Sequence, residues 1–441
     1  CKQFPSRAIY FYSYDWRQSN DNSAAELDNL IQDVKVQTGY SKVDLVCHSM
    51  GGLVASSYVK QYDTTDVRYI ITLATPYEGS PEIITRTLDE RALGTGFIEK
   101  IKGKLLVKNG LTKEIMVGMP SIAELVPTKR YFESTKFLKT GTKPIIGKVK
   151  SEDITYEEYC NIMRSIFGNN YDSAVIFQSS IEDALLNLDN AYFAVATGKN
   201  TVKEVIINDK AASLEALKAI ELTYEGKDEW GDGTVPYISA TMNGMLPDKY
   251  ESINDLAGNS RYREFATDHT GILSHKNTLQ WVKDILNQTS NPDEKNDQID
   301  HPGYTVIRIA CPIDVTIDIN GEVLSSDPEM GLTYVSNGRL DFIGDEGVMI
   351  CLEDIGTVHD ITIVGTGEGT MDYDIRWYDT NNTLTETRSL EAVPITTTTT
   401  ITTTTDNTEF TVLNIDSDGD GVADTQWSVD ASGETVVIDL K

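Results

Sequence analysis

One serine of this sequence lies where a nucleophile would be exposed. The apolar run 43–46 predicts a short strand that leads into Ser49, and a helical pattern begins near Gly51. Such a sharp strand-to-helix turn exposes the serine hydroxyl at the carboxyl edge of a sheet, and the usual pattern is G-x-S-x-G. Cys47 replaces the first glycine with another small residue. We therefore expect Ser49 to attack an acyl carbonyl, with the Met50 backbone N–H as one oxyanion donor.

A nucleophilic serine needs a base and an orienting acid, and candidates for both follow later in the chain. Asp232 lies in the glycine-rich segment 231–236, and His269 precedes a helix with an apolar stripe. The order Ser, Asp, His is one of the known orders of such triads. His275 is the alternative base, although it is better explained as a residue of the helix start. Asp228 is the alternative acid, but it lies outside the glycine-rich turn.

The surrounding elements predict an α/β chain. Ser23 and Glu26 form a capping box for a helix that ends near Gly39, and apolar strands are expected at 69–74 and 192–197. Alternating strands and helices predict a parallel sheet. The long interruption at about 80–190 predicts a cap, since a crossover needs only about a dozen residues. One helical face within it, at 156–167, is expected to pack in the cap core, with an acyl-chain pocket as the alternative.

Several motifs occur in one order that resembles a known family. Besides the elbow they are YDWR at 14–17, LATPYEGS at 73–80, MPSIAELVPTKRYF at 119–132 and GDGTVP at 231–236. Together they resemble the lecithin–cholesterol acyltransferase-like lipases, phospholipases and acyltransferases. The resemblance covers roughly residues 8–288 and implies an α/β-hydrolase domain, which we place at 1–288, with Ser49, Asp232 and His269 as the catalytic triad.

The start of the chain departs from this resemblance. The first expected strand, 8–14, leads directly into YDWR, and no His-Gly type loop precedes Ser49. In α/β-hydrolases an earlier loop of that type carries one of the two oxyanion donors. We therefore expect an N-terminally truncated hydrolase that lacks its second oxyanion donor.

Composition limits the partners. The net charge of −30 argues against nucleic acid or an anionic lipid surface as a partner. No apolar run is long enough for a transmembrane helix. The acidic surface favours a secreted or cell-surface protein of bacterial type.

The character of the chain changes after the hydrolase part. Residues 289–303 are polar and predict a linker, after which short strands and Asn-Gly turns at 304–393 predict a β-sandwich-like domain. Residues 394–441 are expected to form a further β segment, with the threonine run 396–405 as a strand and a stalk as the alternative. This division predicts that the hydrolase part folds without residues 290–441. Acidic sandwich folds also suit contact with a cell surface or a glycan.

An acidic loop in the last segment predicts a structural calcium site. Its ligands would be Asp416, Asp418, Asp420, Asp424 and the backbone of Val422. Position 12 of this EF-hand-like pattern is tryptophan instead of glutamate, so the loop resembles the DxDxDG loops of secreted bacterial proteins. An acidic turn that binds no ion is the alternative.

These observations predict a serine hydrolase of carboxylic esters, with lipid esters as the expected substrates and no cofactor needed for catalysis. Water or an alcohol would accept the acyl group. The alternative from another class is a calcium-stabilised surface or adhesion protein whose hydrolase-like core does not catalyse.

Overall fold

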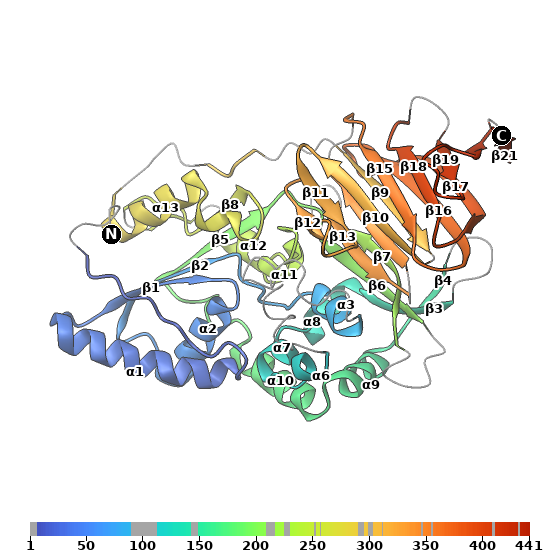
Figure 1. Ribbon diagram of the computed structural model, residues 1–441. Coiled ribbons are helices and arrows are strands. Elements are labelled where there is room, and N and C mark those ends of the chain that lie inside the picture. Colours follow the sequence, from blue (N-terminus) through green and yellow to red (C-terminus); the bar gives the residue numbers. More distant parts are fainter. Residues whose placement is uncertain are drawn as a thin grey trace.

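A computed structural model describes residues 7–89, 113–142, 149–208, 217–224, 230–250, 253–255, 257–289, 295–298, 303–310, 312–344, 347–353, 356–407, 411–430 and 433–441. Figure 1 shows three parts: an α/β layer near the N-terminus, a helical cap beside it, and large β-sheets towards the C-terminus. Within these ranges, no helix is both long and apolar enough to cross a membrane.

The α/β layer is built on a sheet of order β1-β2-β5-β8, in which all neighbours run parallel. Its elements are α1 (Asn20–Thr38), β1 (Val43–His48), α2 (Gly51–Tyr62), β2 (Val67–Leu73), β5 (Ala191–Thr197), α11 (Tyr237–Ala240), α12 (Met245–Tyr250), β8 (Tyr262–Ala266), the 3₁₀ helix η3 (Gly271–Leu273) and α13 (Lys276–Asn287). Every residue of β5 is buried, because helices cover both faces of the sheet. Phe193 and Val195 face α1 and α2, whereas Tyr192 and Ala194 face α13.

The cap follows β2 and contains α3 (Glu82–Leu88), α6 (Lys113–Val117), α7 (Pro120–Glu124), α8 (Lys129–Thr135), β3 (Leu138–Thr142), β4 (Lys150–Asp153), α9 (Tyr156–Phe167) and α10 (Asn169–Ile181). Its strands pair with β6 (Val202–Asn208) and β7 (Ala219–Tyr224) in a sheet of order β4-β3-β6-β7. The sheet of the cap therefore extends beyond the predicted range of about 80–190 and includes β6 and β7. On α9, Tyr159, Met163 and Ile166 are buried in the cap core, as expected.

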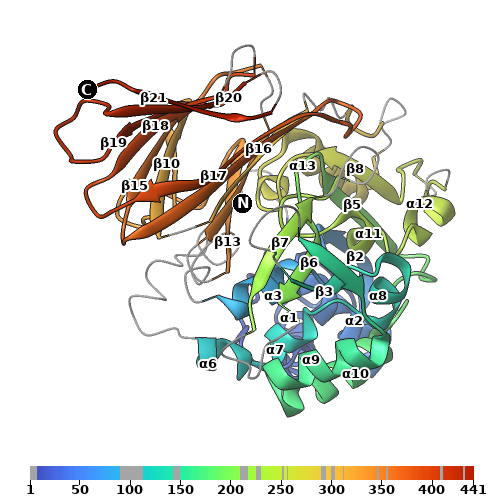
Figure 2. The same cartoon turned by 90° about the vertical axis from the view of Figure 1, so that its right-hand side faces the viewer.

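The C-terminal part consists of two antiparallel sheets of orders β11-β10-β15-β18-β19-β20-β21 and β12-β13-β14-β9-β16-β17. The strands are β9 (Tyr304–Ala310), β10 (Ile313–Ile319), β11 (Glu322–Ser325), β12 (Tyr334–Val335), β13 (Gly338–Ile343), β14 (Gly347–Leu352), β15 (Asp360–Gly365), β16 (Gly369–Tyr378), β17 (Leu384–Ile395), β18 (Thr400–Thr404), β19 (Val412–Asp416), β20 (Thr425–Val429) and β21 (Thr435–Asp439). Side chains of both sheets form one hydrophobic cluster, and Figure 2 shows the two layers. The expected separate segment 394–441 instead continues the first sheet, since β18 pairs with β15.

The C-terminal sheets share a core with the cap. Tyr304, Met349 and Cys351 belong to the same buried cluster as Leu222 and Trp230. Removing residues 290–441 would expose the apolar side chains on the other side of this contact, which costs free energy in proportion to their area. The contact therefore argues against the expectation that the hydrolase part folds by itself, even though a polar segment separates the two in sequence.

Two elements near the N-terminus differ from their predictions. Residues 8–14 do not form a strand, and Phe11 is 91% exposed. Helix α1 begins about one turn before the predicted capping box, with Ser19 as its N-cap. The helix ends as expected, because Gly39 adopts the left-handed conformation at φ 74° and returns its N–H to the Lys35 carbonyl.

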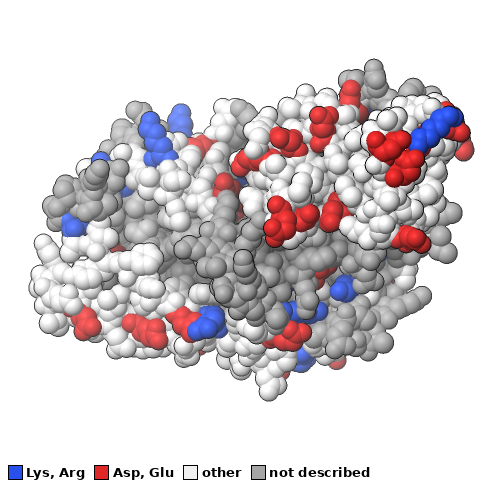
Figure 3. Space-filling view, in the orientation of Figure 1, with Lys and Arg blue, Asp and Glu red and all other residues white. Residues whose placement is uncertain are grey.

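The excess of acidic residues is visible on the surface. Figure 3 shows acidic side chains spread over the C-terminal sheets in this view, with few basic ones beside them. Such a field repels polyanions.

Candidate active site

The turn between β1 and α2 holds Ser49 in a strained conformation. Its φ is 54°, in the left-handed region that few non-glycine residues adopt. The Ser49 N–H donates to the Leu73 carbonyl of the neighbouring strand at 2.8 Å, which fixes the turn to the sheet. Backbone strain of this kind costs about 1–3 kcal/mol and persists only where the surroundings enforce it. The predicted elbow is therefore present in its local geometry.

Small residues let the strand and helix of the elbow approach. A Cβ on Gly52 would lie 2.0 Å from the Thr75 hydroxyl oxygen, so no larger residue fits there. A Cβ on Gly51 would lie 3.8 Å from the Cβ of Cys47, an ordinary contact, so the pair fits together. Burial raises the pKa of the Cys47 thiol to about 12. The thiol therefore stays protonated at neutral pH, as expected of a packing residue and not a nucleophile.

The three candidate residues of the triad meet in one buried chain of hydrogen bonds. His269 Nε2 lies 2.9 Å from Ser49 Oγ, and His269 Nδ1 lies 2.7 Å from Asp232 Oδ2. The exposed fractions of the three residues are 7% for Ser49, 3% for His269 and 1% for Asp232. The structure thus brings together residues from a strand-helix turn and two later loops.

The acid loop fixes one carboxylate oxygen of Asp232 and leaves the other for His269. Oδ1 accepts the N–H groups of Thr234 at 3.0 Å and Val235 at 2.7 Å, which leaves Oδ2 for the His269 ring. The Asp232 carbonyl also accepts the His269 N–H at 2.9 Å. Because both the main chain and the side chain of Asp232 contact His269, the position of the base depends on that of the acid loop.

His48 contacts the base in a way that the sequence pattern did not predict. Its Nε2–H donates to the His269 carbonyl at 2.8 Å, and the two rings lie 4.9 Å apart. Burial, and secondly the nearby His269, lower the pKa of His48 from 6.5 to about 4. His48 is therefore neutral at physiological pH and holds the main chain of His269 in place.

The depressed pKa of His48 predicts a pH dependence of stability. Below pH 6.5 His48 becomes protonated in the unfolded chain, whereas in the folded chain it becomes protonated only near pH 4. Stability should therefore fall as the pH is lowered through this window, by about 3 kcal/mol at most for this group. His48→Gln keeps a donor for the His269 carbonyl but does not titrate. Urea unfolding at several pH values should give the variant the shallower dependence, and equal slopes would contradict the assignment.

The residue after Ser49 supplies the expected oxyanion donor and begins an apolar cluster. Among the described residues, none accepts the Met50 N–H, which is the donor expected from the sequence. The Met50 and Leu53 side chains pack against Phe177 and Ile181 of the cap helix α10. The cap therefore packs apolar side chains against the helix that follows Ser49.

The alternative site residues lie elsewhere. His275 Nε2 lies 3.4 Å from Asp297, and its other ring nitrogen lies near Thr278, so His275 does not join the triad. Asp228 lies outside the described residues. Asp15 and Arg17 form an ion pair with each other at 2.7 Å.

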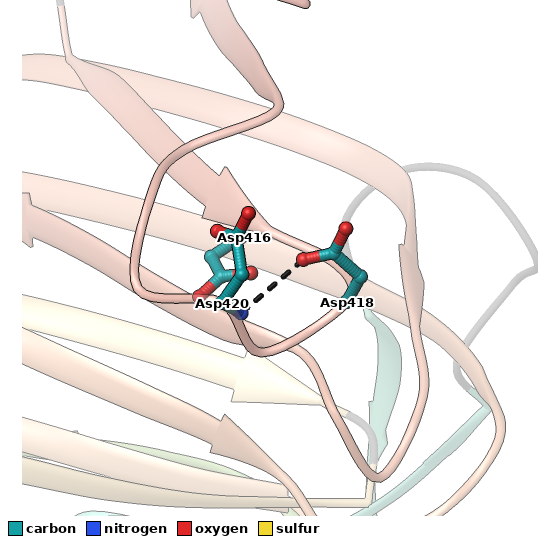
Figure 4. A group of neighbouring side chains, drawn as sticks. All are labelled: Asp416, Asp418 and Asp420. Carbon is teal, nitrogen blue, oxygen red and sulfur yellow. Dashed lines mark hydrogen bonds between the residues drawn. The ribbon is translucent and has the colours of Figure 1, made fainter.

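The acidic loop between β19 and β20 is the candidate metal site. Asp416, Asp418 and Asp420 each offer a carboxylate oxygen within 4.8 Å of the others, and Figure 4 shows them along one turn. Asp416 accepts the N–H groups of Gly419 and Gly421, at 2.7 and 2.8 Å, so the loop curls around this carboxylate. Both glycines have positive φ, which such a turn requires.

The other predicted ligands of this loop differ in their surroundings. Asp424 accepts the Ser417 N–H at 2.7 Å, and the Lys441 ammonium contacts both Asp424 and Asp418. Val422 donates its N–H to Asp420. A C-terminal lysine therefore compensates part of the negative charge that a calcium ion would neutralise.

Comparison with known proteins finds similar sequences in one family. Residues 5–203 match the family model of lecithin:cholesterol acyltransferase. Phospholipase A(1) LCAT3 of Arabidopsis thaliana is 24% identical over 273 residues, 54% of this chain and 60% of that protein. Lecithin-cholesterol acyltransferase-like 4 of the same plant is 26% identical over 330 residues, 65% of this chain and 56% of that protein. Residues 5–203, a little under half of the chain, are therefore similar to the lecithin–cholesterol acyltransferase family, as the motifs predicted, and the chain spans less than two thirds of either relative.

Two solved structures are similar at lower identity. One is the Tle4–Tli4 complex, with 17% identity, 63% of this chain and 68% of that chain covered, and a TM-score of 0.42. The other is the Bacillus licheniformis lipase BlEst2 in its propeptide form, with 12% identity, coverage of 96% and 87%, and a TM-score of 0.30. Both scores are low, and neither likeness bears on what this chain does.

Proposed function

We propose that this chain is a serine hydrolase of carboxylic esters, with lipid esters as its substrates and water or an alcohol as the acyl acceptor. The hydrogen-bond chain from Ser49 through His269 to Asp232 carries the proposal. The names of the similar proteins, a phospholipase A(1) and an acyltransferase-like protein, support a lipid ester as the substrate class.

The mechanism follows from the distances in the triad. With the proton of His269 on Nδ1, its Nε2 accepts the Ser49 hydroxyl proton over 2.9 Å as Oγ attacks the acyl carbonyl. Asp232 holds that tautomer over 2.7 Å and stabilises the imidazolium. The Met50 N–H donates to the oxyanion. The leaving alcohol takes the proton from Nε2, and a second alcohol or water then releases the acyl group from Ser49 Oγ.

The apolar cluster that begins beside Ser49 supports a substrate with an apolar acyl group. Met50, Leu53, Phe177 and Ile181 form a buried apolar cluster that starts at the residue after the nucleophile. Each methylene that such a cluster takes from water contributes about 0.8 kcal/mol. Affinity should therefore rise with acyl-chain length, up to the length at which further methylenes no longer contact the apolar cluster.

The test is hydrolysis of p-nitrophenyl esters of increasing acyl length by the wild-type protein, with release of fatty acid from phosphatidylcholine vesicles beside it. We expect Ser49-dependent turnover with kcat/KM rising with chain length. A fluorophosphonate probe should label Ser49 and no other serine. A folded protein that neither turns over any ester nor takes the probe would instead favour the adhesion protein with a non-catalytic core.

We also propose that the loop from Asp416 to Asp424 binds calcium as a structural ion, with no cofactor in catalysis. Hard oxygen ligands suit calcium, and the three clustered carboxylates supply them. Lys441 would have to leave the loop when the ion binds.

A secreted or cell-surface location of bacterial type suits the acidic surface. A β-sandwich-like domain that contacts a cell surface or a glycan stays a prediction.

The calcium proposal predicts a separation of stability from catalysis. The double change Asp418→Ala and Asp420→Ala should abolish the rise in melting temperature on adding calcium, because it removes two ligands. Esterase kinetics at moderate temperature should be unchanged, since the loop contacts no triad residue. Lys441→Ala serves as the matched control and should bind calcium more tightly. An unaltered calcium response in the double variant, or lost turnover at an unchanged melting temperature, would contradict a structural ion.

A further inference from the structure

The loop that carries Asp232 is held from outside the α/β layer. Trp230 packs edge-on against Tyr304 of β9, with ring centroids 5.9 Å apart. On the other side of Asp232, the Gly233 carbonyl accepts a hydrogen bond from Arg339 Nη1 of β13 at 2.8 Å. The chain therefore contacts the C-terminal sheets on both sides of Asp232, at Trp230 and at Gly233.

The contact at Gly233 is a close one. A Cβ on Gly233 would lie 2.7 Å from the hydroxyl oxygen of Tyr334, the first residue of β12. Gly233 also has a φ of 87°, which favours glycine. The main chain next to Asp232 thus lies directly against the Tyr334 ring and has little freedom to move outwards.

The Arg339 guanidinium is held by two carboxylates besides the Gly233 carbonyl. Its side chain is 5% exposed, and Asp341 accepts from Nε and Nη2 at 2.8 Å each. Nη2 also lies 3.1 Å from Glu82 of the cap helix α3. Asp341 and Glu82 raise the pKa of Arg339 although burial alone would lower it. The guanidinium therefore stays charged and joins three parts of the molecule: the C-terminal sheet, the cap and the acid loop.

A neighbouring turn strengthens this connection. The Gly233 N–H donates to the Thr201 hydroxyl at 2.9 Å, and the Lys199 N–H donates to the Gly231 carbonyl at 3.0 Å. Glu353, at the end of β14, accepts from Lys199 Nζ at 2.8 Å and from the Asn200 N–H at 2.6 Å. The C-terminal part thus holds the acid loop both directly and through this turn.

We propose that Arg339 and Tyr334 are positioning residues for Asp232, so that docking of the C-terminal sheets sets the hydrogen bond between Asp232 and His269. This proposal rests on the proposed function of the triad. Displacements of about 1 Å in such a site cost roughly 100-fold in rate. Asp232 contacts both the ring and the main chain of His269, so a shift of the acid loop also shifts the base away from Ser49.

Arg339→Lys tests the proposal with the fold retained. Lysine keeps the charge between Asp341 and Glu82, but one ammonium cannot reproduce the forked contacts to those carboxylates and the Gly233 carbonyl. The matched control is Arg376→Lys, because Arg376 contacts Glu221 at 3.1 Å across the same contact without touching the acid loop. Tyr334→Ala is the second variant and opens space beside Gly233.

Two readouts separate positioning from simple cohesion. Arg339→Lys should lower kcat by roughly 10- to 100-fold with KM unchanged, and it should weaken the downfield proton resonance of the hydrogen bond between His269 and Asp232. Tyr334→Ala should act in the same direction, whereas Arg376→Lys should leave both readouts as in the wild type. Normal kcat and a normal resonance in Arg339→Lys and Tyr334→Ala would overturn the proposal, as would equal losses in Arg376→Lys.

The resonance keeps this test independent of turnover. If the wild-type protein has no Ser49-dependent activity, the proposed function fails, and the proton resonance alone then decides the positioning role. A wild-type resonance that is lost in Asp232→Asn identifies the signal. If that signal persists unchanged in Arg339→Lys and Tyr334→Ala, the positioning proposal fails whether or not the enzyme is active.

Discussion

Ser49→Ala is expected to lower kcat for ester hydrolysis by roughly 10⁴- to 10⁶-fold, because no other side chain can form the acyl-enzyme. His269 Nε2 would lose its partner at 2.9 Å. The variant should still bind ester, because the apolar cluster of Met50 and Phe177 is untouched. The measurement is steady-state hydrolysis of the best p-nitrophenyl ester, together with probe labelling.

Ser49→Gly, compared with Ser49→Ala, measures the free energy of the backbone strain in the elbow. It removes the same hydroxyl but also the Cβ at a φ of 54°. We expect it to be as inactive as Ser49→Ala and more stable by about 1 kcal/mol. Thermal unfolding of the two variants side by side measures this difference. Turnover in either variant close to that of the wild type would mean that Ser49 is not the nucleophile.

Asp232→Asn should lower kcat by roughly 10⁴-fold while leaving the geometry of the loop intact. Oδ1 accepts two backbone N–H groups, from Thr234 and Val235, so the amide oxygen of an asparagine must take that place. The amide NH₂ then faces His269 Nδ1 and favours the tautomer that carries its proton on Nε2. That nitrogen can no longer accept the Ser49 proton, so the loss should appear in kcat and not in KM.

The neighbouring carboxylate provides a matched control for this variant. Asp268 precedes His269 and accepts the N–H groups of Thr270 at 2.9 Å and Gly271 at 2.8 Å, so its carboxylate holds the turn that follows the base. Asp268→Asn should therefore cost far less than Asp232→Asn. Equal effects of the two changes, or an Asp232→Asn variant with nearly normal kcat, would assign the orienting acid to another residue.

The elbow and the order of the triad could be predicted because their signals are local. A strand of apolar residues, a serine and small residues at fixed offsets specify a turn over less than ten positions. The glycine-rich turn around Asp232 and the helix after His269 are also read from short windows. Only their convergence needed the fold, and a parallel sheet places such loops at one edge.

Local signals were less reliable where a distant group competes for the same backbone. The capping box at Ser23 and Glu26 satisfies the local rule, yet α1 begins at Asn20. Glu124 of the cap accepts from the Ser19 hydroxyl at 2.6 Å and from the Asn20 N–H at 2.9 Å, which stabilises the earlier start. The expected strand at 8–14 has strand-like residues but no strand that pairs with it in the described sheet.

Residue types at short spacing were enough to predict the candidate nucleophile, its expected partners and the parallel α/β layer. The folded structure was needed to show that the sheet of the cap includes β6 and β7, that His48 donates to the His269 carbonyl, and that Arg339 reaches the Gly233 carbonyl across 106 positions of sequence. Contacts of this kind leave no periodic or spaced pattern, since either partner alone is an ordinary residue. Their free energy appears only when packing brings both groups together in a buried place where each needs the other.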